Sequence, residues 1–272
     1  MMDNRDWGRF LYPYEQAVEE LKVKFKSLRA ELKQYEEFAP IEFVTGRVKK
    51  ISSILDKCRR LNVSLENLET GIEDIAGIRI MCQFEEDIQR VASLIRQRKD
   101  MTVVYEKDYV THQKQSGYRS YHMIVRYPVQ SGLGMKEVLA EIQIRTLAMN
   151  FWATIEHSLN YKYKRDLPDE VRLRLRKAAE AAYLLDKEMS SIREEIVDAQ
   201  KLFEDRSNLV DRIMNDIQQL YYYRRVKEAA NFQSAFHERW ENEDIEGLKQ
   251  LAHELQEVLK SEQGRWNIGL DS

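Results

Sequence analysis

Residues 75–82 read Ile75-Ala76-Gly77-Ile78-Arg79-Ile80-Met81-Cys82, an apolar and β-branched run that predicts a buried β-strand. Strand character recurs on both sides of this run. The other predicted strands are residues 41–48, 101–105, 121–127 and 138–145. Pro128 is expected to end the strand before it, and residues 129–135, which include two glycines, are expected to form a turn.

Helical patterns lie before and between the predicted strands. In residues 14–32 the apolar side chains recur at steps of three and four, so they share one helix face. Residues 52–61 and 87–98 are also expected to be helical. A compact region that mixes strands and helices in this way predicts an α+β domain, with a mixed β-sheet flanked by helices.

The C-terminal third has an uninterrupted helical signal. Residues 169–246 contain neither Gly nor Pro. A heptad of apolar residues runs through this part, with Arg206 as its single gap: Leu185, Met189, Ile192, Ile196, Ala199, Phe203, Val210, Ile213, Ile217 and Leu220. The pattern predicts one long helix, or a hairpin that breaks near residues 205–208. Its seam either packs within the chain or joins two chains. A last amphipathic helix is expected from Ile245.

The composition excludes several classes of protein. The chain has 272 residues, of which 43% are hydrophobic, so it can bury a core and is not a disordered chain. Two cysteines exclude a disulfide framework and a cysteine-based zinc site. No segment approaches the roughly 18–20 apolar residues of a membrane span, and residues 1–10 lack the apolar core of a signal peptide. We therefore expect no membrane association and a cytoplasmic location.

The charge is uneven along the chain, although the formal net charge is only −3. Residues 1–165 hold 27 Lys and Arg against 23 Asp and Glu, whereas the remainder holds 16 against 23. A basic excess at the front would attract an anionic ligand, but an excess of this size arises equally by chance. Phosphates would have to be held by side chains, because the sequence contains neither a glycine-rich phosphate loop nor a dinucleotide-binding motif.

Polar residues interrupt two of the predicted strands. Glu141, Gln143 and Arg145 alternate with isoleucines, so their side chains share one face. Such a row is consistent with the floor of a ligand site, but a half-exposed antiparallel strand gives the same alternation. Asp74 precedes the apolar run at residues 75–82 and Arg79 lies within it. A charge in so apolar a segment is expected to be paired or functional.

Cations and an aromatic residue form two further candidate groups. Five cations lie within 14 residues: Arg47, Lys49, Lys57, Arg59 and Arg60. Lys57 and Arg60 are three apart on a predicted helix and share a face, which would hold phosphates or simply be solvated. Tyr118 follows Gly117 in a segment rich in hydrogen-bonding groups. It is either exposed enough to stack on a base or an ordinary packed loop residue.

Five blocks of residues, taken in order, resemble the synthetase domain of the RelA/SpoT family of guanosine tetra- and pentaphosphate synthetases. The blocks are Gly46-Arg47-Val48-Lys49, Asp74-Ile75-Ala76-Gly77-Ile78-Arg79, Ser116-Gly117-Tyr118-Arg119-Ser120-Tyr121-His122, Glu141-Ile142-Gln143-Ile144-Arg145-Thr146 and Trp152-Ala153-Thr154-Ile155-Glu156-His157. The match runs from about residue 7 to residue 203, and the chain resembles a small alarmone synthetase without the hydrolase and regulatory domains of long members. The resemblance implies a nucleotidyltransferase-like synthetase domain at residues 1–204, followed by a helical extension of unknown role at residues 205–272.

The resemblance also implies a reaction. Members of the family transfer the β,γ-pyrophosphate of ATP to the 3′-hydroxyl of GDP or GTP and release AMP. It implies that Asp74 is a Mg²⁺ ligand and that Glu141 is a second ligand, the base for the hydroxyl, or both. The implied ATP-binding residues are Arg47 and Arg79, which would stack on adenine, and the phosphate-binding cations Lys49, Lys57 and Arg60. The implied guanosine-binding residues are Tyr118, which would stack on guanine, with Gln143, Arg145, Asn150 and His157.

An assembly and an effector are further implications of the resemblance. Small members are commonly homotetramers, and some bind an activating guanosine polyphosphate in a central cleft. Lys22, Lys26, Phe43 and Thr45 align with the region that lines this cleft. Composition alone interprets the two lysines as surface residues, because lysine is mostly exposed.

Two other functions remain open at the level of sequence. One is transfer of pyrophosphate to the 3′ end of tRNA, which the basic front of the chain would suit, although its excess is modest. The other is a non-catalytic sensor that binds single-stranded RNA or nucleotides in the same cleft. The presence of both Asp74 and Glu141 argues against the sensor.

Overall fold

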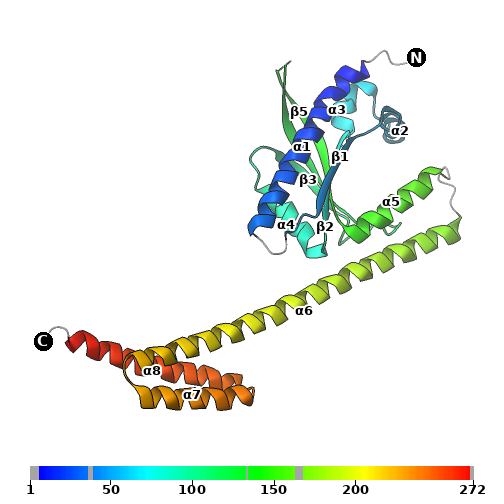
Figure 1. Cartoon of the computed structure of the whole chain (residues 1–272). Coiled ribbons are helices and arrows are strands. Elements are labelled where there is room, and N and C mark those ends of the chain that lie inside the picture. Colours follow the sequence, from blue (N-terminus) through cyan, green and yellow to red (C-terminus); the bar gives the residue numbers. More distant parts are fainter. Residues whose placement is uncertain (1–5, 36–38, 133, 163–167, 270–272) are drawn as a thin grey trace. The chain divides into compact units, whose positions relative to one another are not determined.

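The computed structural model describes residues 6–35, 39–132, 134–162 and 168–269 (Figure 1). The chain divides into two compact units, residues 1–191 and residues 192–272, each with its own hydrophobic core. The boundary expected after residue 204 lies inside one long helix and stays a prediction. No helix within the described ranges is long and apolar enough to cross a membrane.

A five-stranded mixed sheet forms the centre of the first unit, in the order β1-β2-β5-β4-β3. The strands are β1 (Phe43–Val48), β2 (Ala76–Cys82), β3 (Thr102–Asp108), β4 (Tyr121–Ser131) and β5 (Gly134–Thr146). β2 and β5 are parallel, and the other neighbours are antiparallel. The apolar run singled out in the sequence is β2, whose Ile78 and Ile80 are fully buried. The expected α+β fold is therefore confirmed.

Two helices, α1 (Trp7–Tyr35) and α4 (Glu85–Arg96), cover one face of this sheet (Figure 1). The apolar stripe of α1 is buried against the strands, with Leu21 and Phe25 completely inaccessible. At Gly46 on β1 the helix comes so close that a Cβ would lie 3.0 Å from Val18 Cγ1. Glycine at this position therefore lets α1 pack directly on the strand.

The remaining elements of the first unit flank the sheet. Between β1 and β2 the chain forms α2 (Ile51–Leu61), a 3₁₀ turn η1 (Leu65–Asn67) and α3 (Leu68–Gly71). After β5 it forms α5 (Leu147–Lys162) and enters α6 (Asp169–Tyr222). Trp152 Nε1 donates a hydrogen bond of 2.9 Å to the Leu175 carbonyl, which joins α5 to the start of α6. The face of the sheet opposite α1 is left for polar side chains.

The prediction for the hairpin between the last two strands was wrong. β4 continues through Pro128, which pairs with Glu137, and ends only at Ser131. The last pair between β4 and β3 is Arg126 with Thr102. Among the described strands, β4 is therefore paired only with β5 at Pro128. The missing proline N–H then faces the open edge of β4, where a proline is tolerated.

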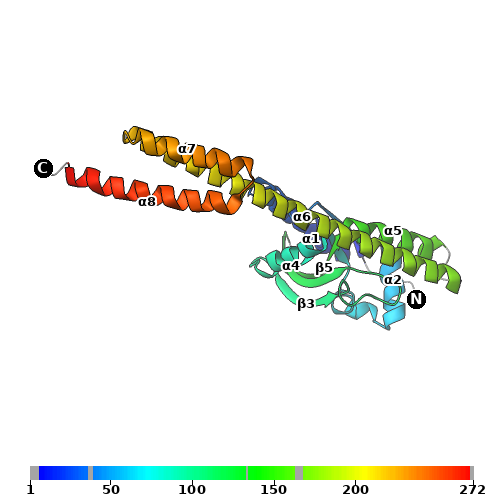
Figure 2. The ribbon, with the colours of Figure 1, turned by 90° about the horizontal axis from the view of Figure 1, so that it is seen from below.

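The second unit is formed by the end of α6 and the two helices that follow it, seen from below in Figure 2. α6 is one continuous helix through residues 205–208, so of the two predicted forms the long helix is correct. It is followed by α7 (Val226–Glu241), which the sequence did not separate, and by α8 (Ile245–Gly269), which starts where expected. The heptad residues Ile213, Ile217 and Leu220 are buried against α7 and α8.

The heptad seam is divided in two by its one polar member. Within residues 192–272, Ile196 is 50% exposed and Phe203 is 74% exposed, whereas Ile213 is inaccessible. The guanidinium of Arg206 lies 4.8 Å from the ring centroid of Trp240 on α7. A cation stacked on an indole replaces the aliphatic contact expected at that position. The later part of the seam thus packs within the chain, as one of the two alternatives predicted.

Candidate active site

The polar face of the sheet forms a cleft where β1, β2 and β5 lie side by side. Its lining comprises Thr45, Gly46, Arg47, Lys49, Asp74, Gly77, Ile78, Arg79, Glu141 and Gln143. Five of the residues proposed from the sequence for ATP or Mg²⁺ are in this set. The alternation on β5 therefore places Glu141 and Gln143 on the floor of a cleft.

Asp74 stands at the entry to β2 between two lysines. Lys49 Nζ donates a hydrogen bond of 2.7 Å to Asp74 Oδ2, and Lys57 Nζ on α2 lies 2.9 Å from Oδ1. Burial opposes ionisation of this carboxyl, but the hydrogen bond from Lys49 and the charges of the two lysines outweigh it and hold its pKa below the usual 3.8. Asp74 is therefore an ionised, half-buried carboxylate at neutral pH.

Two arginines project from adjacent strands into the same cleft. Thr45 on β1 pairs with Arg79 on β2, so Arg47, two residues along β1, is a diagonal neighbour of Arg79 on the same face. Burial lowers the pKa of Arg79, and the charges of Arg145 and Arg47 lower it further. Its Nε donates a hydrogen bond of 3.3 Å to Gln143 Oε1. Two repelling guanidinium planes leave a favourable place for a planar or anionic group between them.

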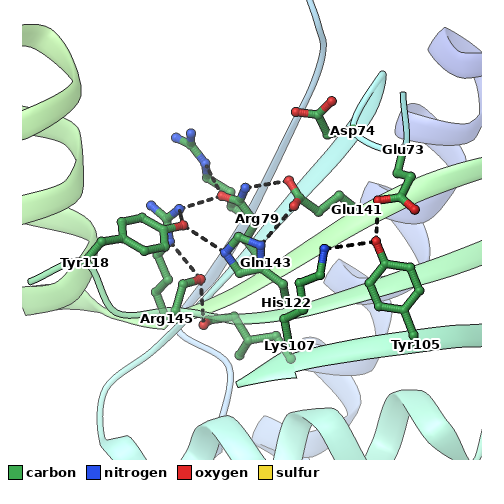
Figure 3. A network of polar contacts seen from close by, with 12 residues as sticks. Glu73, Asp74, Arg79, Tyr105, Lys107, Tyr118, His122, Glu141, Gln143 and Arg145 are labelled. Atoms are coloured by element: carbon green, nitrogen blue, oxygen red, sulfur yellow. Dashed lines mark hydrogen bonds and ion pairs between the residues drawn. The ribbon is translucent and has the colours of Figure 1, made fainter. Parts of the chain in front are cut away.

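Glu141 on β5 is held by two donors, one on each oxygen. His122 Nδ1 lies 2.9 Å from Oε1, and Gln143 Nε2 donates a hydrogen bond of 2.7 Å to Oε2 (Figure 3). Burial again opposes ionisation, but the hydrogen bond and charge of His122 and the amide of Gln143 outweigh it, so the pKa of Glu141 lies below its usual 4.5. The site thus contains two ionised carboxylates, Asp74 and Glu141.

A tyrosine and an arginine extend this network along the sheet. Arg145 is 4% exposed and donates hydrogen bonds of 2.5 Å to the Tyr118 hydroxyl, 3.1 Å to Ser120 Oγ and 2.7 Å to Gln143 Oε1. Tyr118 is half-buried, and Lys114 Nζ lies 4.9 Å from its ring centroid. The ring therefore packs within the site, and Lys114 lies over it.

The loop that carries Tyr118 is held by the first part of α6. Gly117 has φ +89°, and a Cβ at this position would lie 2.6 Å from Ala179 Cβ. The guanidinium of Arg119 lies 3.8 Å from the ring centroid of Tyr183. Glycine is required here both by the backbone conformation and by the close approach of the helix. Helix α6 thus helps to position the tyrosine.

Three residues proposed from the sequence lie outside this network. Arg60 is exposed on α2, although Lys57 on the same helix contacts Asp74. Asn150 lies half-buried in the first turn of α5, and His157 is exposed two turns further along. Their proposed roles stay predictions.

The four residues expected to bind an effector lie on two faces of the sheet within one chain. The stem of Lys22 on α1 approaches Gly46 on the helix-covered face, and Lys26 is exposed one turn further. Thr45 lines the cleft on the opposite face, and Phe43, two residues away on β1, is 38% exposed. One chain does not bring all four together.

His122 contacts both Glu141 and Tyr118, and no role was predicted for it from the sequence. It occurs in one of the quoted blocks, but its place is set by its register pairing with Gln143 across β4 and β5. That register is not readable from a strand pattern alone. Lys107 was missed for the same reason: it donates to the Tyr105 hydroxyl, which donates to Glu73 (Figure 3).

Comparisons with known proteins agree with this geometry. A family model described as "Region found in RelA / SpoT proteins" matches residues 46–166. GTP pyrophosphokinase YjbM of Bacillus subtilis is 59% identical over 202 residues, which cover 74% of this chain and 95% of that protein. GTP pyrophosphokinase YwaC of the same organism is 39% identical over 193 residues, covering 70% of this chain and 92% of that protein.

Solved structures show the same relationship. Small alarmone synthetase 1 from Bacillus subtilis, bound to its product pppGpp, is 60% identical, with 70% of this chain and 98% of that one covered and a TM-score of 0.69. At these identities and coverages the relatives share the fold of the domain that carries the cleft. The chain therefore belongs to the small alarmone synthetases of the RelA/SpoT family.

Proposed function

We propose that this protein transfers the β,γ-pyrophosphate of ATP to the 3′-hydroxyl of GDP or GTP, giving guanosine tetra- or pentaphosphate and AMP. The observation that carries the proposal is the cleft in which the ionised Asp74 and Glu141 stand beside Arg47, Lys49 and Arg79. Cations suit a triphosphate, and two carboxylates suit a metal ion and a base. The relatives named GTP pyrophosphokinase support the same reaction.

On the ATP side, the guanidinium groups of Arg47 and Arg79 are the proposed sandwich for adenine. A planar base between them would replace their mutual repulsion with stacking. Lys49 and Lys57 are the proposed partners of the phosphates, and Arg60 would join them from the exposed side of α2. The two lysines now neutralise Asp74, so a bound triphosphate would share them with that carboxylate.

Mg²⁺ is the proposed cofactor, and the residues present fit it. Asp74 Oδ1 is buried and receives no aligned hydrogen bond, although Lys57 Nζ is 2.9 Å away. The described residues include no cluster of three or more side chains that could hold a metal. A Mg²⁺ ion usually takes one or two carboxylates and completes its shell with phosphate oxygens and water. Asp74 and Glu141 would hold it, and the bound ion would neutralise charge on the transferred phosphates.

On the guanosine side, Glu141 is the proposed base for the ribose hydroxyl. The oxygen O3′ would attack the β-phosphorus of ATP, the bond to the α-phosphate bridging oxygen would break, and Glu141 would accept the proton of the hydroxyl. Tyr118 is the proposed stacking partner of guanine. Gln143, Arg145, Asn150 and His157 are the remaining proposed contacts on this side, the first two from β5 and the others from α5.

We extend the proposal to a cytoplasmic homotetramer that a guanosine polyphosphate activates. Lys22 and Thr45 lie on opposite faces of the sheet in one chain, so an effector that touched both would need more than one chain. The test is the synthesis rate with and without added guanosine pentaphosphate. Activation of the wild type that is lost in Lys26→Ala supports the effector site, and an unaffected rate contradicts it.

The reaction itself is tested with ATP labelled in the γ-phosphate, Mg²⁺ and one acceptor at a time: GDP, GTP or tRNA. We expect label on the guanosine nucleotide and an equal amount of AMP, and no product when the metal is removed by a chelator. Label on tRNA alone would favour the tRNA reaction. Binding of single-stranded RNA without any labelled product would favour the sensor.

A further inference from the structure

His122 lies at the start of β4 and contacts the two sides of the proposed guanosine site (Figure 3). The residue is 7% exposed. Nδ1 lies 2.9 Å from Glu141 Oε1, and Nε2 lies 2.8 Å from the Tyr118 hydroxyl. One imidazole thus connects the carboxylate proposed as the base with the ring proposed to stack on guanine.

The partners of the ring assign its protons. Glu141 is ionised and can only accept, so Nδ1 must carry a hydrogen. The guanidinium of Arg145 can only donate, and it donates to the Tyr118 hydroxyl at 2.5 Å. That hydroxyl is then free to give its own proton to Nε2. The hydrogen on Nδ1 thus follows from the carboxylate that it faces, and the ring is held through both of its nitrogens.

The same contacts fix the orientation of the carboxylate. His122 occupies one lone pair of Oε1, and Gln143 occupies one of Oε2 at 2.7 Å. Each oxygen keeps a second lone pair for a ligand. Without His122, Oε1 would lose its donor and the orientation of the carboxylate would depend on Gln143 alone.

We propose that His122 is a positioning residue, which orients Glu141 toward the ribose 3′-hydroxyl and links that orientation to the guanine-binding Tyr118. The inference rests on the proposed function, because it takes Glu141 as the base and Tyr118 as the base-stacking ring. One side chain makes both contacts, with Glu141 and with Tyr118, and different substitutions can remove each contact separately.

Two substitutions divide the contacts of the ring. In His122→Asn the amide nitrogen takes the place of Nδ1, so the donor to Glu141 is kept and the contact with Tyr118 is lost. In His122→Gln the amide group reaches the place of Nε2, so the contact with Tyr118 is kept and the donor to Glu141 is lost. The matched control is His253→Gln, an exposed histidine on α8.

We expect His122→Gln to lower kcat by about 30- to 100-fold with KM for GDP changed by less than about threefold, as is usual when a supporting hydrogen bond is lost. His122→Asn should keep kcat within about fivefold of the wild type. A purely structural role would lower kcat in both variants alike.

Tyr118→Phe keeps the proposal testable if the His122 variants do not fold, since it removes the hydroxyl that contacts His122 Nε2 and that also accepts from Arg145. We expect kcat to fall about three- to tenfold with KM for GDP little changed. An unchanged kcat in Tyr118→Phe, or a wild-type kcat in His122→Gln, would overturn the inference. If the wild-type protein itself forms no guanosine tetra- or pentaphosphate, the proposed function fails instead.

Discussion

Lys49 donates a hydrogen bond of 2.7 Å to the carboxylate of Asp74, in a site where Lys57 lies 2.9 Å from the second oxygen of the same group. The two lysines reach it from different elements, the segment after β1 and helix α2. One carboxylate therefore sets the position of two cations as well as its own. Removing its charge would leave two half-buried ammonium groups facing each other.

Asp74→Asn should therefore lower kcat by about 100-fold or more, because the site loses both its proposed metal ligand and the charge that holds the lysines. Turnover is measured as AMP release from ATP and GDP. The control is Asp56→Asn on α2, whose carboxylate is 67% exposed and pairs with Arg59 one turn away. A kcat for Asp74→Asn within about threefold of the control would contradict the assigned role.

Gly117→Ala should destabilise the first unit and weaken binding of GDP. The new Cβ would meet Ala179 at 2.6 Å in a residue that has φ +89°, so either the loop or α6 must shift. Strain of this kind costs about 1–3 kcal/mol. Urea unfolding and the KM for GDP measure the two effects. Gly132→Ala is the matched control, since a Cβ there meets no atom within 4 Å, and equal behaviour of the two variants would refute the argument.

The fold was predictable where one local pattern decided it. The buried run of β2 and the alternation of Glu141 and Gln143 on β5 each follow from side-chain periodicity, and both are confirmed. The strand end predicted at Pro128 was wrong. A proline ends a strand only where a neighbouring strand needs its N–H, and the sequence does not show which strand lies beside it. In the sequence Arg206 is only a gap in the heptad. Its partner in the structure is Trp240, which lies 34 positions later in the printed sequence.

The site was predictable only in part, for a related reason. Asp74 and the cations could be grouped because they belong to short motifs that resemble those of a known family. The contacts of His122 depend on the pairing of β4 with β5 and on the loop that brings in Tyr118. These distances across the sheet are tertiary facts that a single sequence does not contain.

Asp186→Asn should stabilise the first unit at neutral pH. Thr146 Oγ1 donates a hydrogen bond of 2.6 Å to Asp186 Oδ2 and accepts one from the Met149 N–H at the start of α5. Burial raises the pKa of Asp186 from 3.8 to about 6, with a further contribution from the charge of Glu85 and against the hydrogen bond of Thr146. The folded state therefore binds more protons than the unfolded state between these values, and stability falls as pH rises through that window.

An asparagine keeps the acceptor for Thr146 and has no charge to bury. Its Tm should exceed that of the wild type by a few degrees at about pH 7.5, and the difference should shrink as the pH is lowered toward about 4. Asp198→Asn, an exposed position on the same helix, provides the control. A constant difference across the pH range would show that the charge of Asp186 is not its cause.

A chain that ends after Glu204 should keep both its activity and its state of association. The truncation removes the whole buried cluster of the second unit, which begins at Leu209. It leaves the cleft and the part of α6 that contacts Gly117 and Arg119. One relative also matches this chain over 202 residues, which are 95% of its own length. We therefore expect kcat per chain to stay within about threefold of the full-length value.

The same number of chains per particle is expected because the part of the heptad seam that the truncation removes is already buried within its own chain. Ile213 and Ile217 pack against α7 and α8 of their own chain, so they are not available to a second copy. The exposed Ile196 and Phe203 remain in the shortened chain. Light scattering of the full-length and shortened proteins should thus give the same number of chains per particle. A smaller number for the shortened protein would mean that residues 205–272 join chains. Packing of the seam within one chain would then be wrong for the protein in solution.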